Sequence, residues 1–291
     1  MPSLRDIRRR IESFENTKKI TKAMEIVAAT RMRKAQQKVQ AARPYAEKML
    51  EVLQTTVDRA TEYRHPWMER RDVRKALLIL ITSDKGLAGG LNVNTIRAAN
   101  RFMNENYPAD PEVVAIGRKG REFMSRFHRN LVAEVTDIPD SPGEKEILPA
   151  TRVAMDEFEK GDVDTVVLAY SKWVSTMRQD PQVRVLIPVE IPERGDQQDS
   201  GKPQADYIYE PEPEAVLDAL LPRYVETQVY QALLEHKASE FSARMMAMRQ
   251  ATENAGELID DMTLVANKVR QQTITTELME IVSGAEVLRA R

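Results

Sequence analysis

The residues best suited to bind a ligand form a glycine-rich segment, Ser83–Leu91 (SDKGLAGGL). Such segments bind phosphate when they connect a strand to the N-terminus of a helix, because several backbone N–H groups then point at one anion. This segment follows an apolar run and precedes a helical pattern, but it has neither the Gly-Lys-Ser/Thr ending of a P-loop nor GxGxxG spacing. A tight structural turn is the favoured interpretation, and a nucleotide-dependent enzyme with helical arms is the alternative.

The other groups able to do chemistry form no catalytic pattern. His65, His128 and His236 lack ligand spacing to one another or to carboxylate pairs, so ordinary surface or boundary positions are expected for them. Asp260 and Asp261 are adjacent on a predicted helix and face different directions, which argues against an acid/base pair. The sequence contains no cysteine, which excludes disulfides, zinc-thiolate sites and thiol switches. We therefore expect no catalytic residue, no metal and no cofactor.

The composition indicates long helices in a chain that does not enter the membrane itself. The 291 residues are 30% charged and 5% aromatic, with fourteen Met. The net charge of −2 conceals a basic first fifty residues, which include the run Arg8–Arg10. A basic segment can bind nucleic acid, an acidic membrane surface or an acidic protein, so a nucleic-acid arm stays an alternative. No run of about 20 apolar residues and no secretory signal is present, so we expect a soluble chain that reaches a membrane only through partners.

Residues 1–60 are predicted to form one helix. Ser3 and Asp6 supply an acidic variant of the capping box at its start. A coiled-coil seam begins with a three-and-four spacing and then shifts, and its predicted members are Leu4, Ile7, Ile11, Phe14, Ile20, Met24, Val27, Ala35, Val39, Ala42, Ala46, Met49 and Leu53. Pro44 is expected to kink or interrupt this helix, because proline cannot donate to the preceding turn.

Residues 212–288 are predicted to form a second, longer helix. Its heptad seam comprises Ala238, Phe241, Met245, Met248, Thr252, Ala255, Ile259, Met262, Ala266 and Val269, and then shifts by one residue to Ile274, Leu278, Ile281, Ala285 and Leu288. A helix of about 75 residues is on the order of 110 Å long. The two terminal helices cover each other's seams most simply as an antiparallel coiled coil, which predicts a slender shaft.

Between the helices, residues 72–192 are predicted to form a Rossmann-like α/β domain. Apolar runs at 76–82, 113–116, 163–170 and 183–189 are typical of buried strands. They alternate with helical patterns at 92–106, 118–127 and 146–159, which favours a mostly parallel sheet with right-handed crossovers. Residues 193–211, which are polar and contain Gly and Pro, are predicted to be a loop at the foot of the shaft.

Four segments resemble the gamma subunit family of bacterial F-type ATP synthases, and the resemblance covers essentially the whole chain. They are residues 18–32 (KKITKAMEIVAATRM), 83–92 (SDKGLAGGLN), 206–211 (DYIYEP) and 274–288 (ITTELMEIVSGAEVL). The last run is similar to the family signature, with Ile274, Thr275, Glu277, Glu280, Gly284 and Ala285 in place. Chloroplast members carry an inserted thiol switch, which a cysteine-free chain cannot have, so a bacterial origin is favoured.

The resemblance implies a non-catalytic rotor. The paired helices would enter the cavity of an alpha/beta hexamer, and the α/β domain with the lower coiled coil would bind the epsilon subunit and the membrane c-type ring. Proton flow would turn the ring and shaft together, and this rotation would drive ATP synthesis on the beta subunits. In reverse, ATP hydrolysis there would turn the shaft. The subunit would also regulate ATPase activity. The chain would lie at the cytoplasmic face of the inner membrane, bound peripherally through these partners and to no nucleic acid.

The resemblance also assigns three sets of contact residues. The first set would face a beta-subunit loop and consists of Lys19, Lys22 and Met24. The second set would make polar contacts with a beta-subunit catch and consists of Arg244, Arg270, Gln271 and Thr275. The third set would meet the ring and the epsilon subunit at the foot and consists of Tyr207, Tyr209 and Glu210.

Overall fold

The computed structural model describes residues 3–60, 63, 65–107, 109–191 and 212–289 of the chain. Contacts between Cα atoms divide the chain into two compact units, each of which contains part of both long helices. The first unit holds residues 1–28 and 245–291, and the second holds residues 29–244.

The first long helix, α1, runs from Leu4 to Arg59, as the sequence predicts. At its start the Ser3 hydroxyl accepts the backbone N–H of Asp6 at 3.2 Å, and the Asp6 carboxylate accepts the backbone N–H of Ser3 at 3.3 Å. This reciprocal pair satisfies two N–H groups that have no partner inside the helix. The expected interruption at Pro44 was wrong, because α1 continues through this residue. The long packed helix tolerates the loss of one backbone hydrogen bond there.

The seam of α1 differs from the prediction near residue 20. Ile20 and Val27, which were expected in the seam, are 61% and 49% exposed. Thr21 and Ala28 are buried in their place and continue the three-and-four spacing without a shift. The Thr21 hydroxyl is accommodated because it donates to the backbone oxygen of Lys18. A search for apolar residues alone therefore misplaced this part of the seam.

The second long helix, α5, runs from Pro213 to Arg289 and contains Pro222. In the first unit it lies against the start of α1, where the hydroxyls of Thr252 and Thr21 are 2.8 Å apart. Gly256, one turn further along α5, approaches the side chain of Lys18, one turn earlier in α1. The opposite direction of these two steps makes the pair antiparallel, as predicted.

The pairing leaves the last part of α5 uncovered by α1. Leu4 precedes Thr21 by 17 residues, so it lies opposite about residue 269 of an antiparallel helix with the same rise. All residues from 271 to 283 are exposed. The second part of the predicted seam is therefore not buried within this unit.

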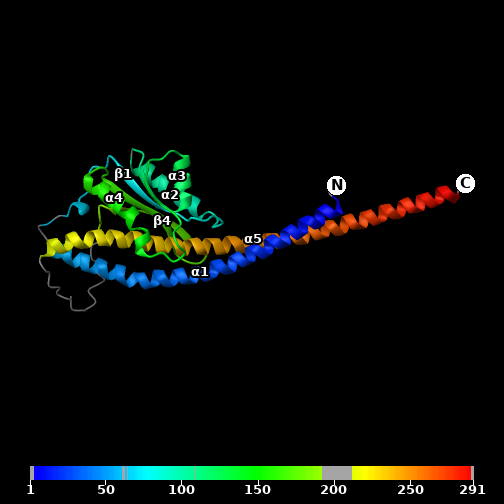
Figure 1. Cartoon of the computed structure of the whole chain (residues 1–291), viewed down its shortest axis with the longest axis horizontal. Helices are drawn as coiled ribbons and strands as arrows, with labels where there is room; N and C mark the ends of the chain where they lie inside the picture. The colour runs from blue at the N-terminus through cyan, green and yellow to red at the C-terminus, as the bar shows by residue number, and fades with distance from the viewer. Residues whose placement is uncertain (1–2, 61–62, 64, 108, 192–211, 290–291) are drawn as a thin grey trace. The chain divides into compact units, whose positions relative to one another are not determined.

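The second unit contains a five-stranded sheet of order β3-β2-β1-β4-β5. Its strands are β1 (Ala76–Ile81), β2 (Glu112–Ile116), β3 (Leu131–Val135), β4 (Thr165–Trp173) and β5 (Gln179–Ile187). The first four are parallel to their neighbours, and β5 pairs antiparallel with β4. Helices α2 (Leu91–Asn106), α3 (Arg118–Arg126) and α4 (Leu148–Lys160) and the short turns η1 (Pro66–Met68) and η2 (Glu144–Glu146) complete this unit (Figure 1). These findings confirm the predicted α/β fold with a mostly parallel sheet.

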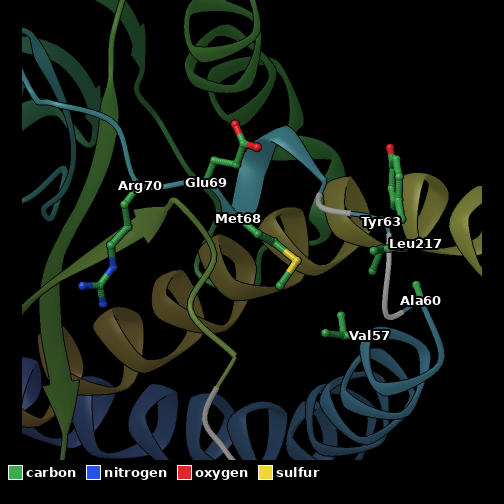
Figure 2. A pocket seen from close by; sticks show the side chains of 7 residues that line it. All are labelled: Val57, Ala60, Tyr63, Met68, Glu69, Arg70 and Leu217. Atoms are coloured by element: carbon green, nitrogen blue, oxygen red, sulfur yellow. The ribbon is translucent and has the colours of Figure 1, made fainter.

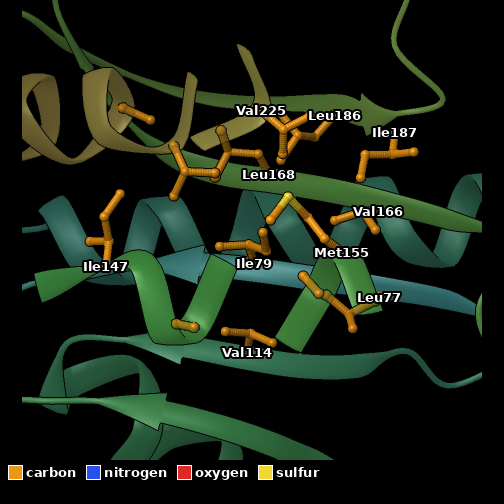
Figure 3. Close-up of a cluster of buried hydrophobic side chains, with 14 of the residues drawn as sticks. Leu77, Ile79, Val114, Ile147, Met155, Val166, Leu168, Leu186, Ile187 and Val225 are labelled. Atoms are coloured by element: carbon orange, nitrogen blue, oxygen red, sulfur yellow. The ribbon is translucent and has the colours of Figure 1, made fainter. Parts of the chain in front are cut away.

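Each face of the sheet has its own core. Leu78 and Leu80 of β1 face α2 and α3, where they pack with Ile96 and Met124. The alternate residues of β1 face α4 and the two long helices, and Figure 3 shows this larger core, with Leu77, Ile79, Val114, Ile147, Met155, Val166, Leu168, Leu186, Ile187 and Val225. Both faces are therefore buried, which explains why β1 reads as a continuous apolar run.

Strand β3 was missed by the sequence prediction. Its residues alternate between partial burial and exposure, and it forms one edge of the sheet beside β2. Five residues of mixed polarity give little periodic signal. The predicted division into residues 1–60, 72–192, 193–211 and 212–288 stays a prediction, and its foot loop lies outside the described residues.

Candidate interaction surfaces

The glycine-rich segment is held by its own hydrogen bonds. The Ser83 backbone N–H donates to Asn92 Oδ1 at 3.0 Å, and Asn92 Nδ2 donates to the Ser83 hydroxyl at 2.6 Å. That hydroxyl in turn donates to the backbone oxygen of Lys85 at 2.8 Å. The Ser83 and Asn92 side chains are thus hydrogen-bonded within the turn itself, whereas the polar groups of a phosphate-binding loop point toward the ligand. This geometry supports the structural interpretation of the segment.

The carboxylate of Asp84 occupies the position where an anion would bind. Its Oδ1 accepts the backbone N–H of Arg118, at the start of α3, at 2.9 Å. Oδ1 also accepts the N–H of Asp137 at 3.1 Å, and Oδ2 accepts the N–H of Ile138 at 2.9 Å. A helix N-terminus and converging backbone N–H groups are the features that hold phosphate in nucleotide-binding sheets. In this chain they hold the protein's own negative charge.

The adjoining edge of the sheet is closed by glycine. Gly117, with a φ of +104°, lies so close to β1 that a Cβ atom would be 2.0 Å from the backbone oxygen of Thr82. Gly120 N–H donates to the Thr82 hydroxyl at 2.8 Å, and a Cβ atom there would lie 2.9 Å from the same hydroxyl. Only glycine permits this approach and this backbone conformation. The carboxyl edge of β1 is therefore filled by the chain itself.

Arg244 connects α5 to the glycine-rich turn. Its guanidinium donates to the backbone oxygens of Lys85 at 3.1 Å and Gly86 at 3.2 Å. It also forms an ion pair with Glu240 at 2.8 Å, and the whole residue is only 8% exposed. Arg244 was expected among the contacts to a beta-subunit catch. In the structure most of its donors are used inside the second unit, and little of the side chain is open to a partner.

The buried face of α5 is polar around His236, which the sequence analysis expected near the surface. That expectation was wrong, because His236 is fully buried and its Nδ1 accepts the backbone N–H of Ser171 at 3.2 Å. Burial lowers the pKa of His236 to about 3, so the ring is neutral. His65 is also buried, and its Nδ1 accepts the backbone N–H of Trp67 at 3.0 Å. Only His128 of the three is exposed, as expected.

Near the start of α1, the predicted contact residues lie on an outward surface. Lys19 and Lys22 are exposed, and Met24 is half-buried. Lys22 forms an ion pair with Glu25 at 3.0 Å. The exposed apolar side chains near them, which the sequence analysis had assigned in part to the seam, are Ile20, Ile26 and Val27. A mixed basic and apolar surface of this kind is typical of protein contact regions.

The predicted contact residues near the end of α5 are also open. Arg270, Gln271 and Thr275 are exposed, and the Thr275 hydroxyl donates to the backbone oxygen of Gln271 at 2.9 Å. The antiparallel register places Lys19 opposite about residue 254, so the two sets are roughly 25 Å apart along α5. They form two separate surfaces of the first unit. Sequence reasoning did not foresee the five large apolar side chains exposed beside the second set, which are Ile274, Leu278, Met279, Ile281 and Val282.

The second unit has an open pocket where α1 ends and α5 begins. Its volume is about 660 Å³, and its lining residues are Val57, Ala60, Tyr63, Met68, Glu69, Arg70 and Leu217. Figure 2 shows Met68 directed toward the space between its own segment and the two helices. The lining combines apolar side chains with the polar Tyr63, Glu69 and Arg70, which suits a protein partner. Tyr207, Tyr209 and Glu210, the predicted foot contacts, lie outside the described residues.

Among the described residues, no group of three or more His, Cys, Asp or Glu side chains could hold a metal ion. None of the helices in the described parts of the chain is long and apolar enough to cross a membrane.

The chain is similar over nearly its full length to known proteins. A sequence model described as ATP synthase matches residues 3–288. The ATP synthase gamma chain of Ralstonia nicotianae is 46% identical over 290 residues, which cover 98% of this chain and 99% of the relative. The corresponding protein of Dechloromonas aromatica is 47% identical over 287 residues, with coverage of 98% and 99%. The chain belongs to the ATP synthase gamma chain family. This finding confirms the resemblance noted in the sequence.

Chains in two solved structures of mitochondrial ATP synthases have a similar fold. A chain of the central stalk and c-ring structure of the Tetrahymena thermophila mitochondrial ATP synthase is 26% identical, with a TM-score of 0.58 and coverage of 80% of this chain and 99% of that one. A chain of the Euglena gracilis mitochondrial ATP synthase, in a structure with OSCP, F1 and c-ring, has a TM-score of 0.68 at 16% identity, with coverage of 99% and 95%. The second likeness supports the family fold alone.

Proposed function

We propose that this chain is the central-stalk rotor subunit of a bacterial F-type ATP synthase. It turns with a membrane c-type ring driven by proton flow, and it imposes its asymmetry on the catalytic beta subunits, which make ATP. In the reverse direction, ATP hydrolysis turns it and pumps protons, and its contacts regulate the rate of hydrolysis. The chain itself is not catalytic, and it associates with the cytoplasmic face of the inner membrane only through its partners.

The single observation that carries this proposal is the exposed end of α5. Residues 271–283 are exposed around the whole circumference of the helix, and they include five large apolar side chains. An exposed apolar surface of this kind favours enclosure by another protein. Polar groups able to make directed contacts, including Arg270 and Gln271, adjoin it. An enclosing ring of alpha and beta subunits fits both properties.

The contact sets follow from this arrangement as proposals. Lys19, Lys22 and Met24 would meet a beta-subunit loop, and Arg270, Gln271 and Thr275 would meet the catch. Arg244 would contribute through the small part of its side chain that stays open and through its hold on the Lys85–Gly86 turn. The exposure of the first two sets supports these roles, because a partner can reach them without unfolding the helix pair.

A further contact surface, in the second unit, would be the pocket where α1 ends and α5 begins. Its lining combines apolar side chains with the charged Glu69 and Arg70, which suits the epsilon subunit or a polar loop of the ring. Tyr207, Tyr209 and Glu210 are proposed to extend the same contact. A pocket of about 660 Å³ is large enough for one or two side chains of such a partner.

Rotation of the chain inside its complex tests the proposal directly. The sequence has no cysteine, so Glu105→Cys on the exposed side of α2 gives a unique attachment point for a bead. We expect stepwise rotation in one direction when the labelled chain is assembled with its cognate alpha and beta subunits and supplied with ATP. A chain that never joins the hexamer, or that joins it and stays still while ATP is hydrolysed, would contradict the proposal.

A further inference from the structure

We propose that a buried polar cluster fixes the register of α5 against the α/β domain, and that torque passes between them through it. The cluster, here called the register clamp, consists of His236, Ser239 and Ser242 of α5 with Ser171 and Trp173 of β4. All five residues belong to the second unit. The inference rests on the proposed rotor function, and it assigns His236 and Ser239 as positioning residues.

The buried face of α5 changes character along the helix. Before the clamp it carries a ridge of fully buried apolar residues with four-residue spacing, namely Leu217, Leu221, Val225, Val229 and Leu233. From residue 235 onward the buried positions are largely polar. Apolar packing is non-directional, so a ridge of similar side chains can slide or rotate slightly at small cost. Hydrogen bonds have narrow limits of distance and angle, so a polar stretch allows one register only.

The clamp bonds to a part of β4 that β1 does not pair with. The pairing of β4 with β1 ends at Ala169, whereas β4 continues to Trp173. Beyond that point α5 provides partners for the backbone of Ser171. The Ser171 N–H donates to His236 Nδ1 at 3.2 Å, and the Ser239 hydroxyl donates to the Ser171 backbone oxygen at 2.9 Å. The strand and the helix are thereby joined through both backbone groups of one residue.

Two further contacts extend the clamp. The Trp173 indole Nε1 donates to the Ser242 hydroxyl at 3.1 Å. The Ser171 hydroxyl lies 2.6 Å from that of Thr95 on α2, so the same residue is also tied to the helix on the other side of the sheet. The three α5 residues follow one another at intervals of three, which places them along one side of the helix. A slip by one residue would move them about 1.5 Å and rotate them by about 100°, and every bond of the clamp would be lost.

Burying the polar groups of the register clamp costs free energy of folding, which indicates that these groups have a functional role. His236 is fully buried, and its Nε2 has no hydrogen-bond partner among the residues that the structure describes. Because Nδ1 accepts from Ser171, the neutral ring carries its hydrogen on Nε2, and this donor is unsatisfied. A leucine here would extend the apolar ridge and avoid this cost. Buried polar groups kept in place of apolar ones are best known for fixing the register of packed helices.

The test replaces the clamp in the assembled complex. In His236→Leu with Ser239→Ala, both bonds to the Ser171 backbone are absent. With the bead on Glu105→Cys, we expect assembly and ATP hydrolysis at low load to persist, while angular fluctuations in each dwell widen and rotation stalls at a smaller opposing load. In the full-length chain, the Ser171 amide should exchange its hydrogen about fivefold faster or more, as follows from loss of a hydrogen bond that protects against local opening.

Matched variants separate register from stability. Val229→Ala, in the apolar ridge, lowers thermal stability without touching the clamp, and it should leave dwell width and stall load unchanged. His236→Asn places an amide oxygen near the position of Nδ1, so its dwell width and stall load should equal those of the wild type. If the double variant does not assemble, Ser239→Ala alone removes one hydroxyl and should show the same change in smaller degree.

The possible failures are distinguishable. A wild-type chain that does not rotate in its complex would overturn the proposed function. A wild-type chain that rotates, with clamp variants that show wild-type dwell width and stall load, would overturn the register clamp alone. Equal softening in Val229→Ala and in the clamp variants would also overturn it, because stability and not register would then explain the effect.

Discussion

His236 Nδ1 accepts the backbone N–H of Ser171 at 3.2 Å, so an uncharged imidazole holds the long helix α5 to strand β4. The bond requires a neutral ring, because a protonated ring has no acceptor nitrogen. Burial keeps the ring neutral and lowers its pKa from 6.5 to about 3. The protonation state of one residue therefore affects both the register of α5 and the stability of the chain.

The first prediction concerns acid stability. Between pH 6.5 and about pH 3 the unfolded chain binds a proton at His236 and the folded chain does not, so stability falls as the pH falls through this window. We expect the free energy of unfolding of the wild type to decrease by about 1.4 kcal/mol more per pH unit than that of His236→Asn. Urea unfolding of both proteins at roughly pH 6, 5 and 4 measures this difference.

The comparison with His236→Asn also removes a competing effect. Burial raises the pKa of Glu235, which works in the opposite direction, since its folded form takes up a proton at higher pH than its unfolded form. Glu235 is present in both proteins, so its contribution cancels in the difference. Equal slopes in the two proteins would show that His236 titrates normally in the folded chain.

The second prediction concerns the close approach of α3 to β1. Gly117→Ala would place a methyl group 2.0 Å from the Thr82 backbone oxygen at a φ of +104°. We expect it to destabilise the chain by more than about 2 kcal/mol, through both overlap and backbone strain. Gly86→Ala is the control, because a Cβ atom there has no neighbour within 4 Å. Urea unfolding should separate the two variants clearly, and similar stabilities would contradict the observed packing.

A third prediction tests the role of Asp84. Asp84→Ala removes the acceptor of three backbone N–H groups and should lower the free energy of unfolding by about 3 kcal/mol, since hydrogen bonds to charged groups contribute about 1.5–3 kcal/mol each and water replaces some of them. Asp72→Ala, at an exposed position, should change stability by less than about 0.5 kcal/mol. Thermal unfolding followed by circular dichroism would detect the difference.

How much of the fold could be predicted from the sequence depended on the kind of interaction that buries each residue. The buried strands β1, β2 and β4 and the two long helices were predictable, because burial on both faces and a sustained seam leave strong patterns. Thr21 was missed as a seam residue, since its burial depends on hydrogen bonds and not on apolar character. The same reason applies to His236, whose partner Ser171 lies 65 residues away in the chain.

The contact residues were assigned by resemblance only, and these assignments stay predictions. Nothing in the spacing of Arg270, Gln271 and Thr275 indicates a partner, and on any helix they would suit solvent equally well. Arg244 illustrates the limit of such reasoning, because its hydrogen bonds to Lys85 and Gly86 join segments far apart in the sequence. A residue beside a seam can therefore face either a partner or the chain's own turn.

The fourth prediction addresses the proposed catch. Gln271→Ala should lower the rate of ATP hydrolysis in the assembled complex by about fivefold, the effect of losing one neutral hydrogen bond of about 1 kcal/mol in a rate-limiting rotation step. Gln272→Ala removes the same side chain from the next position, about 100° around the helix, and serves as the control. Equal rates in both variants, with normal assembly, would remove Gln271 from the proposed contact.

The fifth prediction addresses the proposed beta-subunit loop near Met24. Met24→Lys adds a cation beside Lys19 and Lys22, and a charge-assisted hydrogen bond to a partner contributes about 1.5–3 kcal/mol. Such a contact would hold the rotor at one angle, so we expect fewer protons pumped per ATP hydrolysed in membrane vesicles. Met24→Leu, which conserves volume, should pump normally. Unchanged coupling in Met24→Lys would place this surface away from the partner.

The Asp84 carboxylate bears on whether the α/β domain can bind a phosphate-containing metabolite. Sheets of this architecture often hold a nucleotide where Asp84 lies, and a protein that does so changes with the concentrations of ATP and phosphate in the cell. Here the N–H groups of Arg118, Asp137 and Ile138 are already taken by an internal negative charge, which also repels an incoming phosphate. In the proposed rotor, this edge of the sheet therefore offers no open site for a phosphate group.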